Sequence, residues 1–321
     1  MRRPPPAHEL RAPRWGAGRR ARGVALLIAV LIAALLAAAS TWLAWHQMLA
    51  IRRSEDMLVS DRAWAALLGA EAVAAQGLVD SLRGAPSVNL QQAWAKPQQA
   101  VLGDGAELIG NVTDLQGRLN LNDLALGAPN QAIMLWRFQR LLTVAGTQPE
   151  IAAAVTDWTN PVPVASAAGG AGDDYYLGLS PPYRTAAQPF VSVTSLRLVR
   201  GFTQPVYAAL LPDVTALPAV TPININTAPP GVFEALGLSA QQAQLVLAQR
   251  EKTPFASVAQ LLESPLLAGL RFDPAGLGVG SQYFQVNLQV RQGRLQTGLS
   301  SVIELEGQHA RVLLRARNAL P

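Results

Sequence analysis

The sequence predicts an α+β fold: one long N-terminal helix packs against a small antiparallel sheet, and a large all-α segment is inserted into that sheet. Three observations lead to this prediction. A helical pattern without proline runs through residues 24–82. Polar and apolar residues alternate, as in strands, at residues 107–121 and again after residue 280. Between these two regions, residues 122–276 have mainly the pattern of helices and loops.

The chain begins with a basic leader, residues 1–23, followed by an apolar stretch, residues 24–45, that is long enough to cross a membrane. At 1.5 Å per residue the uncharged stretch makes a helix of about 33 Å, against ~30 Å for a hydrocarbon core. Arginines crowd its start, and Trp42 and Trp45 mark its end. We therefore expect a single-pass inner-membrane anchor with the N-terminus in the cytoplasm and the bulk of the chain outside it.

The net positive charge of the chain belongs to the leader. The formal net charge of the chain is +5, but seven arginines precede Val24, with only Glu9 against them. From Val24 onward the acidic residues outnumber the basic ones by one. The rest of the chain therefore gives no electrostatic reason to expect an acidic partner.

Three interpretations of the leader remain open. A secretory signal would be cleaved after the apolar run, where "LAAAS" at residues 36–40 resembles a cleavage site. A plain anchor would not be cleaved at all. A prepilin-type leader would end at Gly23 and be cut by a prepilin peptidase between Gly23 and Val24, which leaves the apolar helix on the mature protein. The third interpretation is the one that we favour.

The helical pattern continues beyond the apolar stretch to about Leu82 and becomes amphipathic. A long helix with an apolar first half and an amphipathic second half resembles the stem of type IV pilins and pseudopilins. That resemblance implies a pilin-like core made of residues 46–121, with the helix and the first strands, and residues 277–321, with the C-terminal strands. Within the core, we expect a hairpin around residues 114–117 and two or three strands after residue 280, with a turn at Gln292 and Gly293.

Position 28 departs from the pilin pattern. Pilins generally carry a glutamate at the fifth mature position, which here is Ile28. Such a glutamate neutralises the α-amino group of a neighbouring subunit inside an apolar bundle, where an unpaired charge is expensive. A subunit without the acid suits a position with no neighbour ahead of it, so Ile28 is a candidate determinant of filament position. The alternative is that Ile28 is an ordinary residue of a membrane anchor.

Several motifs resemble those of the general secretion pathway protein K family, the large minor pseudopilins of type II secretion. They occur in the order of the family: "DLQGRLNLNDL" at 114–124, "DW" at 157–158, "YY" at 175–176 and "ININTAPPGVFEAL" at 223–236. The stretches "SPPYRTAAQPF" and "LRLVRGF" also resemble the family. The resemblance implies that the insertion 122–276 consists of two SAM-like subdomains, at about 122–220 and 221–276.

The resemblance also implies a function and partners. The protein would stand at the tip of the pseudopilus, initiate its assembly and support the export of folded proteins across the outer membrane. Its partners would be two smaller minor pseudopilins in a tip trimer, the major pseudopilin, the prepilin peptidase and the inner-membrane assembly platform. Exoprotein substrates or the secretin are further possible contacts.

A calcium-binding loop is a further implication of the resemblance. Its candidate ligands are Asp157, Asn160, Asp173 and Asp174. The family tends to have an acid where Asn160 stands, and fewer carboxylates mean weaker calcium binding. A weak calcium site and no site at all therefore both remain open. Independently of calcium, Asp157 would be a polar residue at a helix end and Trp158 a core anchor.

The segment that begins at Ile223 also resembles the helix-hairpin-helix module of competence DNA receptors. Helices are predicted near 228–236, 240–250 and 257–262, with Thr227, Ser239 and Ser257 as caps. The turn 237–239 has lost one of the two glycines that such modules use, and residues 223–280 have one more acid than base. DNA affinity depends mainly on basic side chains. A membrane-anchored DNA-binding protein is therefore the alternative function, and we expect no nucleic-acid partner.

The composition also limits catalysis. The chain has no cysteine and three histidines, His8, His46 and His309. A disulfide framework and a thiolate metal site are thus excluded, and a histidine zinc site or a Ser-His-Asp triad has little material. We predict no catalytic residues and a protein that is not an enzyme.

Overall fold

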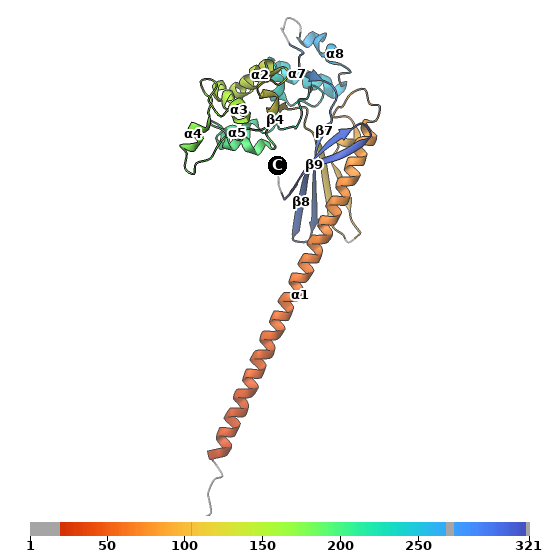
Figure 1. Ribbon diagram of the computed structural model, residues 1–321. Helices are drawn as coiled ribbons and strands as arrows, with labels where there is room; N and C mark the ends of the chain where they lie inside the picture. The colour runs from red at the N-terminus through yellow and green to blue at the C-terminus, as the bar shows by residue number, and fades with distance from the viewer. Residues whose placement is uncertain (1–19, 104, 268–272, 319–321) are drawn as a thin grey trace, which may run out of the picture. The chain divides into compact units, whose positions relative to one another are not determined.

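The computed structural model describes residues 20–103, 105–267 and 273–318, so residues 1–19 of the predicted leader lie outside it. The chain forms two compact units, one that ends at Asp61 and one that begins at Arg62. Helix α1, Arg20–Leu82, belongs to both (Figure 1). The predicted end of this helix at Leu82 is confirmed, and the following turn contains Gly84 with a positive φ of 69°, as is common after a helix.

From residue 23 to residue 58, α1 is not covered by any other part of the chain that the structure describes. Every residue from 23 to 58 is exposed, including Leu26 and Leu27, which are 68% and 69% exposed. By length and composition alone, α1 contains a stretch that is apolar enough to cross a membrane. Lipid or other protein is needed to cover this surface, because water does so at a large free-energy cost.

The second unit contains a five-stranded antiparallel sheet in the order β1-β2-β7-β8-β9. Its strands are β1 Gln98–Val101, β2 Glu107–Asp114, β7 Tyr283–Gln292, β8 Leu295–Glu306 and β9 His309–Arg317. Strands β2 and β7 are far apart in the sequence but lie side by side, with Leu108 opposite Val290 and Asp114 opposite Phe284 (Figure 1). The insertion therefore leaves the sheet after β2 and returns to it at β7.

One face of the sheet packs against the second half of α1. Leu67 and Leu78 of the helix lie in one buried cluster with Phe284, Val286 and Ile303 of the strands. Apolar and polar residues alternate in β7 from Phe284 onward, and every second side chain of a strand points to the same side. The apolar side chains of β7 from Phe284 onward therefore all face the helix.

A partly buried ion pair also joins α1 to the sheet. Glu71, which is 3% exposed, accepts hydrogen bonds from the hydroxyl of Ser301 and from the guanidinium of Arg315. Arg315 approaches within 2.7 Å of the carboxylate. The helix and strands β8 and β9 are thus linked by a polar contact as well as by apolar packing.

The hairpin that was predicted around residues 114–117 is wrong. Strand β2 ends at Asp114, and the next strand, β3 Leu119–Asn120, pairs in parallel with β4 Val214–Thr215 in a separate sheet. The Cα atom of Gly117 is packed against Thr227, so close that a Cβ atom there would lie 2.7 Å from the Thr227 backbone. This long-range contact directs the chain into the insertion. Strand β1, which is exposed at all four positions, was not predicted.

The insertion is mainly helical, and the predicted fold class is confirmed. Its α-helices are α2 Gln131–Val144, α3 Ala152–Thr159, α4 Asp173–Leu177, α5 Gln204–Leu210, α6 Pro230–Ala235, α7 Ala240–Lys252 and α8 Val258–Leu262. The 3-10 helices of the chain are η1 Ala93–Ala95, η2 Leu121–Leu124, η3 Pro149–Ile151, η4 Val193–Leu198 and η5 Pro265–Leu267. Two short parallel strand pairs, β3 with β4 and β5 Ile223–Asn224 with β6 Leu277–Gly278, were not predicted.

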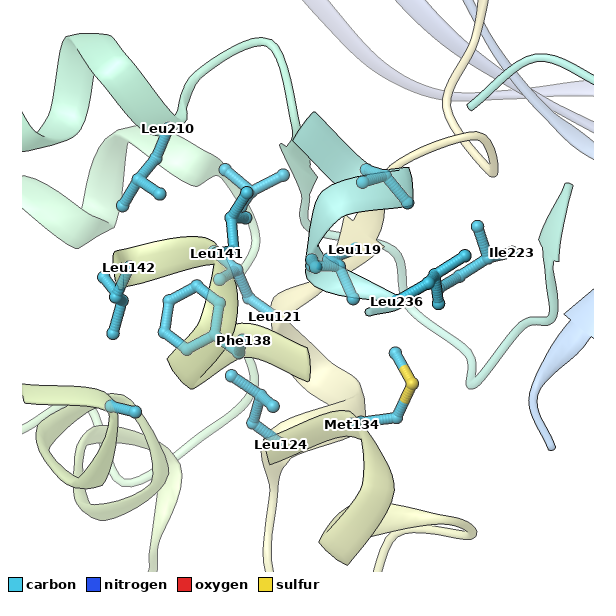
Figure 2. Close-up of a cluster of buried hydrophobic side chains, with 14 of the residues drawn as sticks. Leu119, Leu121, Leu124, Met134, Phe138, Leu141, Leu142, Leu210, Ile223 and Leu236 are labelled. Carbon is cyan, nitrogen blue, oxygen red and sulfur yellow. The ribbon is translucent and has the colours of Figure 1, made fainter. Parts of the chain in front are cut away.

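One apolar core fills the insertion. Figure 2 shows Phe138, Leu141 and Leu142 of α2 beside Leu121 and Leu124. The same cluster contains Leu210 and Leu236, so residues on both sides of the predicted boundary near 220 share it. Phe138 is fully buried and stacks on Phe202 with 6.3 Å between ring centroids.

Two of the three predicted helix caps occur. Ser239 and Gln242 form the predicted capping box at the start of α7. The Ser257 side chain accepts from the Gln260 N–H, but the Gln260 side chain accepts from Ala256 instead of Ser257. The third cap, Thr227, is wrong, because α6 begins at Pro230 and the Thr227 hydroxyl donates to Asp114.

We expect Phe138→Ala to lower the free energy of unfolding by about 3–5 kcal/mol, because it removes a fully buried ring and leaves a cavity. Chemical denaturation of the full chain in detergent measures this. Val144→Ala, an exposed position on the same helix, should change the free energy by less than about 0.5 kcal/mol. Equal losses for the two variants would contradict the assignment of Phe138 to the core.

Candidate functional site

The predicted cleavage and filament-position residues all lie near the start of α1. Gly23, Val24 and Ile28 are exposed, and nothing lies within 4 Å of the position of a Cβ atom on Gly23. The sequence contains no acid between Glu9 and Glu55. The helix surface around Ile28 is therefore entirely without negative charge, and cleavage before Val24 stays a prediction.

A second exposed surface of α1 lies in its amphipathic half. Ala65, Gly69, Val73 and Gly77 follow one another at intervals of four residues and are all exposed, Val73 at 74%. Nothing lies within 4 Å of a Cβ position on Gly69 or Gly77. A glycine inside a helix costs about 1 kcal/mol relative to alanine, and no contact within the described chain explains these two.

The first predicted calcium ligand, Asp157, is completely buried at the end of α3. Both of its carboxylate oxygens accept from the N–H of Ser166 at 3.2 Å, and Oδ2 also accepts from the N–H of Ala171 at 3.0 Å. The neighbouring Trp158 is buried and packs edge-on against Tyr176, with 5.2 Å between ring centroids, which confirms its prediction as a core anchor. Burial raises the pKa of Tyr176 to about 12.

Asp173 has a different set of partners. Arg184 donates to its Oδ2 at 2.8 Å, and both the N–H and the hydroxyl of Thr185 donate to its Oδ1 at 3.0 Å. The hydrogen bond from the Thr185 N–H is the main cause that holds the pKa of Asp173 below its ordinary value, and the charge of Arg184 adds to it. Sequence reasoning missed Arg184, although it stands in the stretch "SPPYRTAAQPF".

The structure does not gather the four candidate ligands around one point. The side-chain oxygen of Asn160 accepts from the N–H of Val162 at 2.9 Å, and Asp174 is exposed. Among the described residues, no three His, Cys, Asp or Glu side chains form a group that could hold a metal ion. Calcium takes six to eight oxygen ligands, whereas the oxygens of Asp157, Asn160 and Asp173 accept hydrogen bonds from donors of the same chain. As they are arranged, these residues do not fit a calcium ion.

The turn 237–239 of the segment that resembles a helix-hairpin-helix module is not arranged to bind a phosphate. A DNA-binding turn would direct its backbone N–H groups at a phosphate, but all three here donate within the chain: Gly237 to Glu234 O, Leu238 to Phe233 O and Ser239 to Gln242 Oε1. Arg250 is buried and donates to backbone carbonyls, and burial lowers its pKa to about 10. The geometry therefore gives the DNA-binding alternative no support.

The motifs at 114–124 and 223–236 meet in a buried group of hydrogen bonds. This group lies where the insertion leaves the sheet and returns to it. The carboxylate of Asp114 accepts hydrogen bonds from the Thr227 and Ser281 hydroxyls, both at 2.6 Å, and from the Asn224 amide at 3.0 Å. Its other oxygen accepts from the N–H of Gln116 at 2.8 Å. Burial raises the pKa of Asp114, and these hydrogen bonds oppose the rise. Asp114, Asn224 and Thr227 of these motifs thus hold the fold together where the insertion meets the sheet.

Asp123, in the same first motif, is 2% exposed and lines a small cavity of about 90 Å³. Its Oδ1 accepts from the Asn120 amide at 2.8 Å. Burial raises the pKa of Asp123 to about 7, and the Asn120 hydrogen bond only partly offsets this. Burial likewise raises the pKa of Asp213 to about 6. These carboxyl groups are therefore easier to protonate in the folded chain than in the unfolded one.

The family models and the known proteins that match this chain carry the same family name. Two family models, both described as type II secretion system (T2SS), protein K, match residues 117–219 and 223–280. The type II secretion system protein K of Pseudomonas aeruginosa is 32% identical, over 94% of this chain and 93% of its own length. That of Pectobacterium carotovorum subsp. carotovorum is 34% identical, over 92% and 96%.

A solved structure is also similar. It is a chain of the crystal structure of the GspK-GspI-GspJ complex from the type 2 secretion system of enterotoxigenic Escherichia coli. The match has a TM-score of 0.75 and 26% sequence identity, and covers 84% of this chain and 100% of the other.

We expect the buried Asp123 to lower the stability of this chain as pH rises from about 4 to 7. Over this range Asp123 binds more protons in the folded than in the unfolded state, so each rise in pH favours unfolding. The loss from Asp123 amounts to at most about 4 kcal/mol. Asp123→Asn should flatten the pH profile of the unfolding free energy, measured by denaturation of the full chain. Asp174→Asn, which removes an exposed carboxylate, is the control. Parallel profiles for Asp123→Asn and the wild type would contradict the prediction.

Proposed function

The chain belongs to the family of type II secretion system protein K, and on this basis we propose that it is the minor pseudopilin at the tip of the type II secretion pseudopilus. There it initiates pseudopilus assembly and supports the export of folded proteins across the outer membrane. The single observation that carries the tip position is the uncovered apolar surface of α1 with Ile28, and not an acid, at its fifth position after Gly23.

The tip position follows from charge. Inside a bundle of apolar helices, the new α-amino group of each subunit needs a negative partner, because an unpaired charge is costly there. A subunit that lacks the acid has no negative charge to pair with the α-amino group of a subunit ahead of it. It can still be followed by subunits whose own acids need a partner, since its α-amino group at Val24 is free once the leader is removed.

The same helix supports the proposed location. Residues 24–45 cross the inner membrane once, with the basic leader in the cytoplasm and the second unit in the periplasm. A prepilin peptidase removes the leader at Gly23, and the inner-membrane assembly platform and the major pseudopilin act on the processed chain.

The proposed close partners are two smaller minor pseudopilins of the same system, which form a tip trimer with this chain. The similar solved chain was crystallised in a complex with GspI and GspJ. On this chain, the small exposed residues Ala65, Gly69 and Gly77 allow partner helices to approach α1 closely, and the exposed Val73 between them offers an apolar contact. The role is structural and not enzymatic, with exoproteins or the secretin as further contacts and without nucleic acid.

We expect Ile28→Glu to reduce secretion and recovery of the tip complex by about tenfold or more, because an unpaired carboxylate in the apolar bundle is costly. Ile28→Leu is the matched control and should behave like the wild type. Secretion of a reporter exoprotein and co-purification of the two minor pseudopilins measure the effect. If Glu at position 28 left both unchanged, the missing charge would not determine the tip position.

The double variant Gly69→Leu with Gly77→Leu tests binding of the partner helices independently of the folding of this chain. It should leave the isolated chain as stable or slightly more stable, since leucine favours helix over glycine and open space surrounds both positions. It should nevertheless weaken binding of the minor pseudopilins by about tenfold or more, because the helices are kept apart. Unchanged binding in a pull-down with purified partners would contradict the proposed contact.

A further inference from the structure

The loop 160–172, between α3 and α4, is built around the carboxylate of Asp157. Donors from two separate parts of the loop, the N–H groups of Ser166 and Ala171, point at this buried carboxylate. Hydrogen bonds to an ionised acceptor are stronger than neutral ones. The carboxylate therefore holds the two parts of the loop together, which is the role that a bound cation plays in a calcium loop.

The backbone closes tightly on this centre. A Cβ atom on Gly170 would lie 2.2 Å from Oδ2 of Asp157, and one on Gly172 would lie 2.4 Å from the carbonyl oxygen of Pro163. The Pro163 carbonyl accepts from the N–H of Asp173 at 2.9 Å. Six to eight oxygens around a calcium ion would require this loop to open.

Two arginines supply positive charge at the edge of the loop. Arg184 pairs with the carboxylate of Asp173 at 2.8 Å. Arg200 donates to the backbone carbonyl of Gly170 at 2.9 Å, and its guanidinium lies 4.9 Å from the centre of the Tyr175 ring. A carboxylate and a backbone carbonyl are typical calcium ligands, and each is engaged here by a guanidinium of the same chain.

We propose that Arg184 and Arg200, together with the N–H groups that Asp157 accepts, replace the calcium ion that the family resemblance implies, so that loop 160–172 folds without a metal. The loop is then self-contained, and its structure does not respond to the calcium concentration of the periplasm. This inference does not depend on the tip position. Calcium binding by the loop would overturn it and leave the proposed function intact.

The direct test uses the full chain in detergent, in millimolar calcium chloride and in excess EGTA. Thermal melting should be the same in both, metal analysis should find no stoichiometric calcium, and the amides of Ser166 and Ala171 should exchange hydrogen equally slowly. A rise in melting temperature with calcium, or slower exchange of these two amides, would overturn the proposal.

Variants test the arginines themselves. Arg184→Gln combined with Arg200→Gln should speed amide exchange in the loop several-fold in both buffers, because the variant loses the Arg184–Asp173 ion pair and the hydrogen bond from Arg200 to the Gly170 carbonyl. Asp157→Asn should speed it by about tenfold or more, because its amide group places a donor against a loop N–H. Glu263→Gln, which changes an exposed carboxylate outside the loop, is the control and should have no effect. Amide exchange at the wild-type rate in the arginine double variant would contradict the proposal that Arg184 and Arg200 stabilise the loop.

Discussion

An apolar helix surface that the described part of the chain leaves uncovered limits where this protein can be stable. From residue 23 through residue 58, α1 is exposed at every position, and it carries no acid before Glu55. Such a surface is stable only in lipid or against other apolar helices. In the proposed function it lies in a membrane before assembly and in a helix bundle after it. The second half of α1 packs against the sheet, so the same helix connects this apolar surface to the folded part of the chain.

The insertion is joined to the sheet by polar contacts, and residues of the recognisable motifs make these contacts. Asp114 accepts from Thr227, Ser281 and Asn224, and thereby connects the segment where the insertion begins to the middle of the insertion and to the segment where the chain returns to the sheet. A buried carboxylate that lost these donors would be left unpaired at considerable cost. The residue types at these positions are therefore determined by the fold, as are the N–H donors that surround Asp157.

Features with a local cause could be predicted from the sequence. The end of α1 at Leu82, the capping box of Ser239 and Gln242, and the alternating strands after residue 280 each depend on neighbouring residues. Predictions failed where a distant segment decides the outcome. The turn after Asp114 looked like a hairpin, but Thr227 packs on Gly117 and supplies the competing contact. The hydrogen-bond donors to Asp157 and Asp173 could not be predicted either, because the sequence does not show which donors the fold places beside these carboxylates.

Removal of the leader would make α1 the N-terminus of a mature filament subunit, and the mass of the N-terminal peptide of the protein extracted from its native membrane would reveal this. We expect a peptide that begins at Val24, after removal of a leader that ends at Gly23. A peptide that begins at Met1 would indicate a plain anchor, and one that begins after Ala39 would indicate a secreted protein. Either result would contradict assembly into a pseudopilus.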